Sequence, residues 1–505
     1  MDHTHTREEP EARSSLRGGR LGVIGIVFFV VAAAAPLVGM TGAVPIAIVL
    51  GNGAAAPGAY LAVGLTLLLF SVGYAAMSQR VTNAGAFFAY IGRGLGRHLG
   101  LGAAFVSLIA YIGIQLAIFG FFGGLMSGQM AALGVDLPWW FWTLAAWLVI
   151  TALSLASVDV GAKVLGVLML LELASLVVTA IAILIDGGPA GYDFAASFSP
   201  SAILVGGLAG SAGIAFAFAF ASFIGFEATA IYGEESKNPK RVVPRATYLA
   251  VGVITTLFAV TAFALVTGMG ASSVVAKTVE YSTVDGVPLA DPAAVLFTLA
   301  TQYVGSWMAT VMSVLVISSL FAGALAFQNA ACRYVFALAR GGVLPRALGG
   351  TNANGAPQRG SLTTSAVTAA VIITFIIAGL EPVLHMFYWF SGLAVVAIVL
   401  IEALVCVAVI AFFRRHRDGE NIFTTTIAPL IAMAGLLIGE YLLMSRFGLL
   451  AGTTAEGVDP AATSWGLSPL GWVLVLLPFA VLLVGWMLSH LRRPENEAFV
   501  RDELS

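Results

Sequence analysis

Charged residues are scarce in this chain of 505 residues. Only 10% of the residues are charged, whereas 59% are hydrophobic, and soluble globular domains usually carry about 25% charged residues. This deficit excludes an ordinary soluble domain and predicts a membrane protein that sits in a lipid bilayer. The formal net charge is −2, so no excess of one sign points to nucleic acid or to an acidic partner.

Cysteine and catalytic motifs are also scarce. The two cysteines, Cys332 and Cys406, lie in apolar runs, where they act as small hydrophobic residues, so we expect neither a disulfide nor a metal pair. No HExxH, G-x-S-x-G or P-loop pattern lies at a membrane face, which argues against a membrane enzyme. We therefore expect no catalytic residue, no metal and no cofactor.

Long hydrophobic runs, in contrast, are abundant. A spanning helix needs about 20 mostly apolar residues, and by this measure the sequence predicts twelve transmembrane helices in an all-α membrane protein. No cleavage site follows a short apolar core, so the first run is expected to be a span and not a signal peptide. The predicted spans cover residues 21–50, 58–77, 100–133, 139–156, 164–185, 203–232, 248–269, 293–338, 361–380, 384–413, 425–447 and 469–491.

The positive charges predict the orientation of these spans. With a cytoplasmic N-terminus, only Lys277 and Arg446 of the 24 Lys and Arg residues fall on the outer side, as the positive-inside rule requires. We therefore expect a multi-pass protein of the plasma membrane with both termini in the cytoplasm. The polar segments 1–20 and 492–505 are predicted to be cytoplasmic tails, the first of them disordered.

Two predicted spans contain residues that break helices. Residues 32–45 (AAAAPLVGMTGAVP) hold Pro36 and Pro45 around two glycines, and Gly225 is the breaker in residues 219–228 (AFASFIGFEA). Irregular backbone at membrane depth survives only beside a cavity or inside protein. The two spans are five apart, and a unit of five helices must repeat in inverted orientation. We predict a five-plus-five inverted repeat, about 21–185 and 203–413, in which helices 1 and 6 are discontinuous.

Several segments point to one family. Residues 223–246 read FIGFEATAIYGEESKNPKRVVPRA, residues 82–96 read TNAGAFFAYIGRGLG, and residues 329–345 read NAACRYVFALARGGVLP. They resemble, in order, the end of helix 6, the amphipathic segment after helix 2 and the end of helix 8 in the amino acid–polyamine–organocation (APC) superfamily of secondary transporters. Residues 35–45 match the helix 1 break of that family loosely, without its Gly-Ser-Gly form. The resemblance implies a transport core at 21–413 with two peripheral helices at 425–491.

We expect a substrate with an amino and a carboxylate group, bound mostly by backbone. Broken helices expose N–H groups at their starts and C=O groups at their ends. The outer half of helix 1 should begin near Gly39–Gly42 and face the carboxylate, and the half-helix ending near Phe220–Ser222 should face the ammonium group. The predicted substrate-binding residues are Val38, Gly39, Met40, Thr41, Gly42, Phe218, Phe220, Ala221, Ser222, Phe223, Gly225, Tyr111 and Gln115.

Some of these residues have a second interpretation. The phenylalanines of helix 6 could face lipid, and Tyr111 and Gln115 could join helices by hydrogen bonds.

Four glutamates lie at predicted membrane depth, where an ionised acid costs about 2.5–3.5 kcal/mol on insertion scales. Glu227 follows Gly225, where helix 6 should resume, so it could couple to an ion or cap the helix. The resemblance places Glu172 where some proton-coupled relatives carry a lysine near a sodium site. Glu172 could therefore bind a proton, help to hold a cation, or be satisfied by a neighbouring helix. No motif supports Glu402 or Glu440, and we expect structural roles for both.

The function predicted from these observations is secondary active transport of amino acids, with protons as the coupling ion. Ser318 and Ser319 on the eighth span could instead supply oxygen ligands to sodium. An amino-acid exchanger or a polyamine importer of the putrescine type are alternatives within the family, and the latter requires acidic side chains that face the site. A membrane enzyme, a channel or a receptor is the alternative from a different class.

Overall fold

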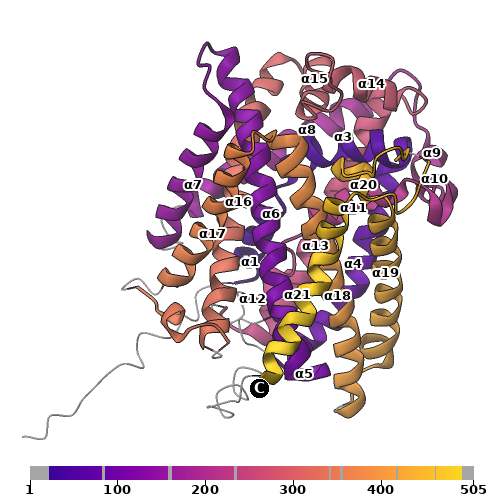
Figure 1. Ribbon diagram of the computed structural model, residues 1–505. Helices are drawn as coiled ribbons and strands as arrows, with labels where there is room; N and C mark the ends of the chain where they lie inside the picture. The colour runs from indigo at the N-terminus through magenta and orange to yellow at the C-terminus, as the bar shows by residue number, and fades with distance from the viewer. Residues whose placement is uncertain are drawn as a thin grey trace, which may run out of the picture.

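The computed structural model describes residues 22–81, 86–156, 162–231, 236–340, 343–352, 356–416, 419–460 and 462–491. Within these residues the chain is a bundle of helices (Figure 1). Eleven stretches of them are long and apolar enough to cross a membrane, which confirms the predicted all-helical membrane protein. The predicted tails 1–20 and 492–505 lie outside the described residues, as do Glu234 and Glu235 of the charged segment after helix 6.

The long helices follow the predicted spans closely. They are α4 (Ala56–Ser78), α6 (Arg97–Ala132), α7 (Trp139–Ala156), α8 (Ala162–Asp186), α13 (Pro239–Met269), α16 (Ser306–Arg340), α17 (Gln358–Ile377), α18 (Tyr388–Arg415), α19 (Ala428–Ser445) and α21 (Pro469–Leu491). Shorter segments complete the chain: α1 (Val23–Ala34), α2 (Pro36–Val38), η2 (Gly39–Ala43), α3 (Val44–Ile46), η3 (Ala47–Asn52), η4 (Gly53–Ala55), α5 (Ala86–Leu95), α9 (Phe194–Phe198), α10 (Pro200–Ile203), η5 (Gly207–Ala209), α11 (Ala212–Phe223), α12 (Ala228–Ile231), α14 (Val274–Ser282), α15 (Ala293–Tyr303), η6 (Arg346–Gly349), η7 (Pro382–Phe387), η8 (Phe423–Ile427) and α20 (Phe447–Ala451).

The first apolar stretch contains both the first and the second predicted span. Counted as one stretch, Val23–Ser78 has 56 residues, far more than the roughly 20 that cross a bilayer. Non-helical backbone at Gly51 and a positive φ of 61° at Gly53 separate its two halves. The stretch is therefore long enough for two crossings, with a bend at the glycines between them.

The eighth predicted span was too long. Residues 293–338 form two helices, α15 and α16, because Gly305 between them adopts a φ of +129°, which a continuing helix cannot contain. With 11 residues, α15 is too short to cross a bilayer. It lies with α14 at the upper end of the bundle in Figure 1, whereas α5 lies at the opposite end.

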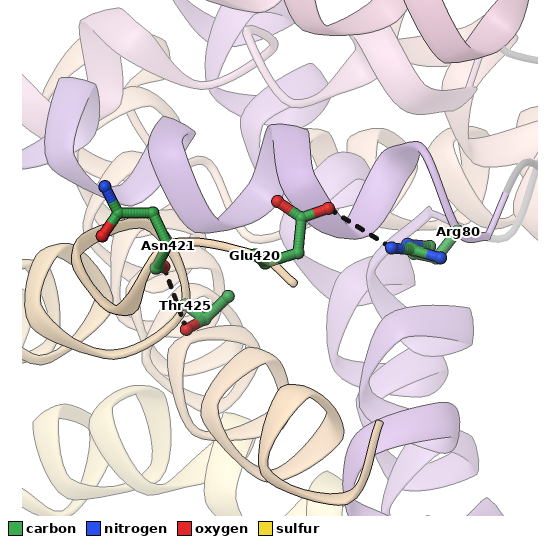
Figure 2. Close-up of polar contacts among 4 residues, drawn as sticks. All are labelled: Arg80, Glu420, Asn421 and Thr425. Carbon is green, nitrogen blue, oxygen red and sulfur yellow. Dashed lines mark hydrogen bonds and ion pairs between the residues drawn. The ribbon is translucent and has the colours of Figure 1, made fainter. Parts of the chain in front are cut away.

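A surface ion pair joins α4 to the connection between α18 and α19. Arg80 Nη2, just beyond α4, lies 3.3 Å from Oε1 of Glu420 (Figure 2). Beside it, the backbone carbonyl of Asn421 accepts a hydrogen bond from the Thr425 hydroxyl at the start of η8. About a third of each charged side chain is exposed, so the pair contributes at most about 1 kcal/mol. It places the C-terminal ends of α4 and α18 at the same end of the bundle.

Glycines allow neighbouring helices to pack closely. A Cβ atom added at Gly64 of α4 would overlap the side chain of Thr255 on α13, and one added at Gly213 of α11 would overlap the backbone of Leu442 on α19. Apolar side chains provide little driving force for association in lipid, so small residues that permit close contact stabilise membrane helix pairs.

Replacing Gly64 by valine tests this packing. We expect Gly64→Val to destabilise the protein by about 1–3 kcal/mol, because overpacking forces side chains or backbone to move. Gly252 on the partner helix α13 has no atom within 4 Å of an added Cβ, so Gly252→Val is a matched control. Thermal unfolding of the purified protein in detergent should show a lower midpoint for Gly64→Val, and equal midpoints for the two variants would contradict the packing.

Candidate substrate and ion site

The helical backbone is interrupted at Ala35. The first helix, α1, ends at Ala34, and Ala35 adopts a left-handed conformation with φ 43° and ψ 68°. Helical backbone resumes at Pro36 and continues through Gly39–Ala43 as a π-helix. The interruption therefore precedes Gly39–Gly42, where the sequence interpretation expected the outer half of helix 1 to begin.

Proline explains the position of this interruption. The residue before a proline avoids the α-helical region for steric reasons, and proline itself suits the first position of a new helix because it has no N–H to leave unpaired. Pro36 thus ends α1 two residues upstream, at Ala34, and starts the next helical segment. Pro36 is visible in the sequence as a signal for this interruption, but the prediction placed the helix start at the two glycines downstream.

The carboxyl group of Glu172 binds the start of the resumed helix. Glu172 Oε1, on α8, accepts a hydrogen bond from the Leu37 N–H at 2.6 Å and from the hydroxyl of Ser319 on α16 at 2.9 Å. Leu37 carries the first backbone N–H after the interruption, where a helix N-terminus favours negative charge. One buried carboxyl therefore joins three segments that are far apart in the sequence.

A small cavity lies beside this carboxyl. Its volume suits a water-sized group. Its lining residues include Glu172, Ser318 and Ser319, and the remaining ones are Ala32, Leu168, Met169 and Ala322. Among the described residues, no group of three or more His, Cys, Asp or Glu side chains could hold a metal ion. The site offers one carboxyl and two hydroxyls to a proton, a water or a monovalent cation.

A second irregular segment follows α11. The helix ends at Phe223, residues 224–227 form a turn in which Gly225 has a φ of +115°, and α12 begins at Ala228. Glu227 holds this turn, because its Oε2 accepts a hydrogen bond from the Gly225 N–H at 2.9 Å. Its Oε1 accepts another from the Tyr111 hydroxyl at 2.9 Å, and the Tyr74 hydroxyl donates to its backbone carbonyl at 2.7 Å. Both carboxyl oxygens are thus satisfied by the protein.

The two irregular segments lie against each other. A Cβ added at Gly225 would be 2.8 Å from Cβ of Ala33, which is in the last turn of α1. A Cβ added at Gly39 would be 3.2 Å from Oγ of Ser222 in the last turn of α11. The two irregular segments, and glycines from each, therefore meet at one place inside the bundle.

Aromatic rings cover Gly42. A Cβ added there would lie 2.9 Å from the ring of Phe121 and 3.3 Å from the ring of Phe387. These two rings stack with centroids 4.9 Å apart, and Phe218 lies next to Phe387 at 6.3 Å. Phe218 therefore belongs to an aromatic cluster beside helix 1, together with Tyr388.

The other predicted phenylalanines point elsewhere. The ring of Phe220 would contact a Cβ added at Gly439 of α19 at 2.6 Å, and Phe223 packs edge-on against Phe258 of α13. Phe220 and Phe223 are both buried against protein.

Hydroxyl and amide groups of the predicted site have defined partners. Thr41 donates to the Leu37 carbonyl within its own helix, and Ser222 lies 3.2 Å from the Tyr60 hydroxyl of α4. Gln115 donates to Gln328 of α16 at 2.9 Å and accepts from Thr368 of α17 at 3.4 Å, so it connects helices. Of the remaining predicted residues, Met40 is fully buried, and Val38 and Ala221 are partly buried.

The backbone of Leu37 and the hydroxyl of Tyr74 are participants that the sequence interpretation missed. A backbone N–H has no signal of its own in a sequence, although Pro36 marks the place where one is free. Tyr74 lies in an apolar helix without any motif, so its contact with the Glu227 carbonyl required the folded structure.

A bundle of long apolar helices defines a multi-pass membrane protein, and buried carboxyls beside irregular backbone are typical of transporters. The chain belongs to the amino acid permease family, whose model matches residues 25–491. This confirms the resemblance to the APC superfamily, and the protein is accordingly a transporter and not an enzyme.

Two relatives illustrate the range of this family. The chain is 28% identical over 336 residues to the branched-chain amino acid permease BcaP of Lactococcus lactis subsp. cremoris (strain MG1363), which covers 63% of this chain and 67% of the relative. It is also 28% identical over 207 residues to the cadaverine/lysine antiporter of Escherichia coli (strain K12). That second match spans 40% of this chain and 41% of the antiporter.

Replacing Gly225 by alanine tests the contact between the two irregular segments. We expect Gly225→Ala to destabilise the protein by about 1–3 kcal/mol, because alanine disfavours positive φ and its Cβ would collide with Ala33. Gly96 also has a large positive φ, 101°, but has no atom within 4 Å of an added Cβ. Gly96→Ala therefore carries a similar backbone penalty without the collision, and thermal unfolding of both variants isolates the contact. A loss no larger in Gly225→Ala than in Gly96→Ala would exclude the contact.

Proposed function

We propose that this protein imports amino acids across the plasma membrane by alternating access, in symport with protons. The family match and the buried carboxyls support this proposal. In the proposed topology both termini are cytoplasmic, and residues 21–413 form a transport core of two inverted five-helix repeats. The helices at 425–491 lie outside those repeats.

The irregular segments at Ala35 and at residues 224–227 are, in this proposal, the discontinuous parts of helices 1 and 6. Two interrupted helices at corresponding positions of inverted halves mark the binding site in many secondary transporters. Their mutual contact through Gly225 and Ala33 supports the assignment. The residues proposed to bind substrate remain those predicted from the sequence, with the helix start moved from Gly39 to Pro36.

The observation that carries the coupling proposal is the bond from the Leu37 N–H to Glu172. A charge-assisted hydrogen bond is about twice as strong as a neutral one, and the donor here is the first N–H of the resumed helix. When Glu172 takes up a proton, this bond weakens and the helix start loses the charge that holds it. Proton binding would thereby change the conformational preference of helix 1, which is the linkage that a symporter requires.

The backbone also suits a zwitterionic substrate. Neither Val23–Asn52 nor Ala212–Phe223 contains a lysine or an arginine, so recognition of a carboxylate there would depend on N–H groups. The aromatic cluster at Phe121, Phe218 and Phe387 would contact an apolar side chain. The relative named as a branched-chain amino acid permease is consistent with such a substrate.

Amine exchange is the second candidate function. It draws support from the relative named as a cadaverine/lysine antiporter, and it would need acidic groups that share one cavity. Glu172 and Glu227 instead bind different partners, Leu37 and Ser319 in one case and Gly225 and Tyr111 in the other. Of these two acids, Glu172 lines the small cavity and Glu227 does not, which favours amino acids over polyamines.

Uptake into proteoliposomes tests the proposal. A pH difference of one unit stores about 1.4 kcal/mol per proton, which drives about a tenfold accumulation. We expect the parent protein to reach an accumulation of this order for an apolar amino acid, and Glu172→Gln to reach only equilibration because its amide cannot take up a proton. Competition by a panel of amino acids and polyamines identifies the substrate class.

The control variant is Glu381→Gln, since Glu381 is exposed. It should accumulate substrate as the parent does. Unchanged accumulation by Glu172→Gln would refute the coupling role of Glu172. Uptake by the parent that does not depend on the pH gradient would favour exchange.

A further inference from the structure

Two buried glutamates take no part in the site described above. Glu402 lies in the middle of α18, and Glu440 lies on α19, which packs against α4, α11 and α18. Their exposed fractions are 2% and 7%. The sequence interpretation expected structural roles for both, and a structural role requires hydrogen-bond partners for a buried acid.

Those partners are missing for most of their oxygens. Among the described residues, Oε2 of Glu402 and both carboxyl oxygens of Glu440 have no hydrogen-bond partner. The contrast with Glu172 and Glu227 is clear, since backbone N–H and hydroxyl groups donate to both of those carboxyls. An ionised carboxylate buried without donors or a counter-charge costs several kcal/mol, and it becomes neutral by binding a proton instead.

The groups that face these two acids do not supply a compensating charge. Glu402 interacts electrostatically with the carboxyls of Glu227 and Glu440, with the Tyr74 hydroxyl of α4 and with the thiol of Cys406 one turn along α18. All four are acids, so an ionised Glu402 would be destabilised by its neighbours. For Glu440, the interacting acid is Glu402.

Several polar side chains on the helices packed against α18 and α19 bond to other groups. The Tyr111 hydroxyl of α6 donates to Glu227, and the Tyr60 hydroxyl of α4 bonds Ser222. His98 of α6 bonds Ser489 of α21. Arg446, at the C-terminal end of α19, donates to the backbone carbonyls of Ala209, Gly210 and Pro460. None of these bonds joins Arg446 to Glu440, whose carboxyl oxygens have no partner among the described residues.

We propose that Glu402 and Glu440 form a second proton-binding site, with each carboxyl protonated in this conformation. A proton fits this site better than an amine does, because a Cβ added at Gly439, the neighbour of Glu440, would lie 2.6 Å from the ring of Phe220. The site joins α18 and α19, both of which pack against α11. When Glu402 loses its proton, its negative charge would raise the free energy of ionising Glu227. The two carboxyls would therefore ionise in alternation.

The coupling role of this site rests on the proton-driven transport proposed above. The protonation of the two acids does not depend on that proposal, and infrared spectroscopy detects protonated acids directly. A protonated carboxyl has a C=O stretching band that a carboxylate lacks, and the band shifts in deuterated water. We expect the purified parent protein at neutral pH to show such bands, Glu402→Gln and Glu440→Gln each to lose one component, and Glu381→Gln to retain all of them.

If the parent protein shows no protonated-carboxyl band, that result alone overturns the proposal, whatever the variants show. A band that is intact in both glutamine variants would overturn it as well. Glu440→Asp, which keeps an acid on α19, should retain the band if the loss in Glu440→Gln comes from the carboxyl and not from misfolding. Loss of the band in Glu440→Asp to the same extent would contradict the assignment.

Transport assays separate this inference from the proposed function. We expect Glu402→Gln to retain counterflow of unlabelled against labelled substrate, but to accumulate less substrate than the parent under a pH gradient. Accumulation and pH profile equal to those of the parent would contradict the coupling role. If the parent itself shows no pH-driven uptake, the proposed function fails, whereas the infrared result still decides whether the two acids hold protons.

Discussion

The interaction on which the account depends is the hydrogen bond from the Leu37 N–H to the carboxyl of Glu172. Pro36 ends one helix and starts the next, which leaves a backbone donor free inside the bundle, where a missing partner costs several kcal/mol. Glu172 supplies that partner from α8, and Ser319 fixes the carboxyl from α16. An irregular backbone and a buried acid, each unfavourable alone in a membrane, therefore stabilise each other.

Three ways of placing an acid inside the bundle follow from the same physical constraint. Glu172 binds a helix start, Glu227 closes its own turn through the Gly225 N–H, and Glu402 and Glu440 have oxygens without donors among the described residues. The first two arrangements tolerate a negative charge, since donors face it. The third favours a neutral carboxyl, as proposed for Glu402 and Glu440. Differences of this kind would let one protein keep some acids ionised and others protonated at the same pH, which the proposed coupling to protons requires.

Much of the fold could be predicted from the sequence, since apolar runs of about 20 residues are a direct consequence of bilayer thickness. Gly225 and Glu227 could also be predicted as a pair, because a glycine with positive φ followed by an acid is a local pattern. The division of residues 293–338 into α15 and α16 was missed, as Gly305 is one glycine within an apolar run. The true start of the resumed helix at Pro36, the contact of Tyr74 with Glu227 and the orientation of Phe220 towards α19 depend on packing between distant segments.

Hydrogen–deuterium exchange of the amides at Leu37–Gly39 tests the central interaction most directly. A hydrogen bond to a charged group contributes about 1.5–3 kcal/mol, so removing the charge should speed local opening about tenfold or more. The account predicts faster exchange there in Glu172→Gln, with unchanged exchange in the middle of α13 as an internal reference. Equal exchange at Leu37 in the parent and in Glu172→Gln would contradict the claim that this carboxyl holds the start of the helix.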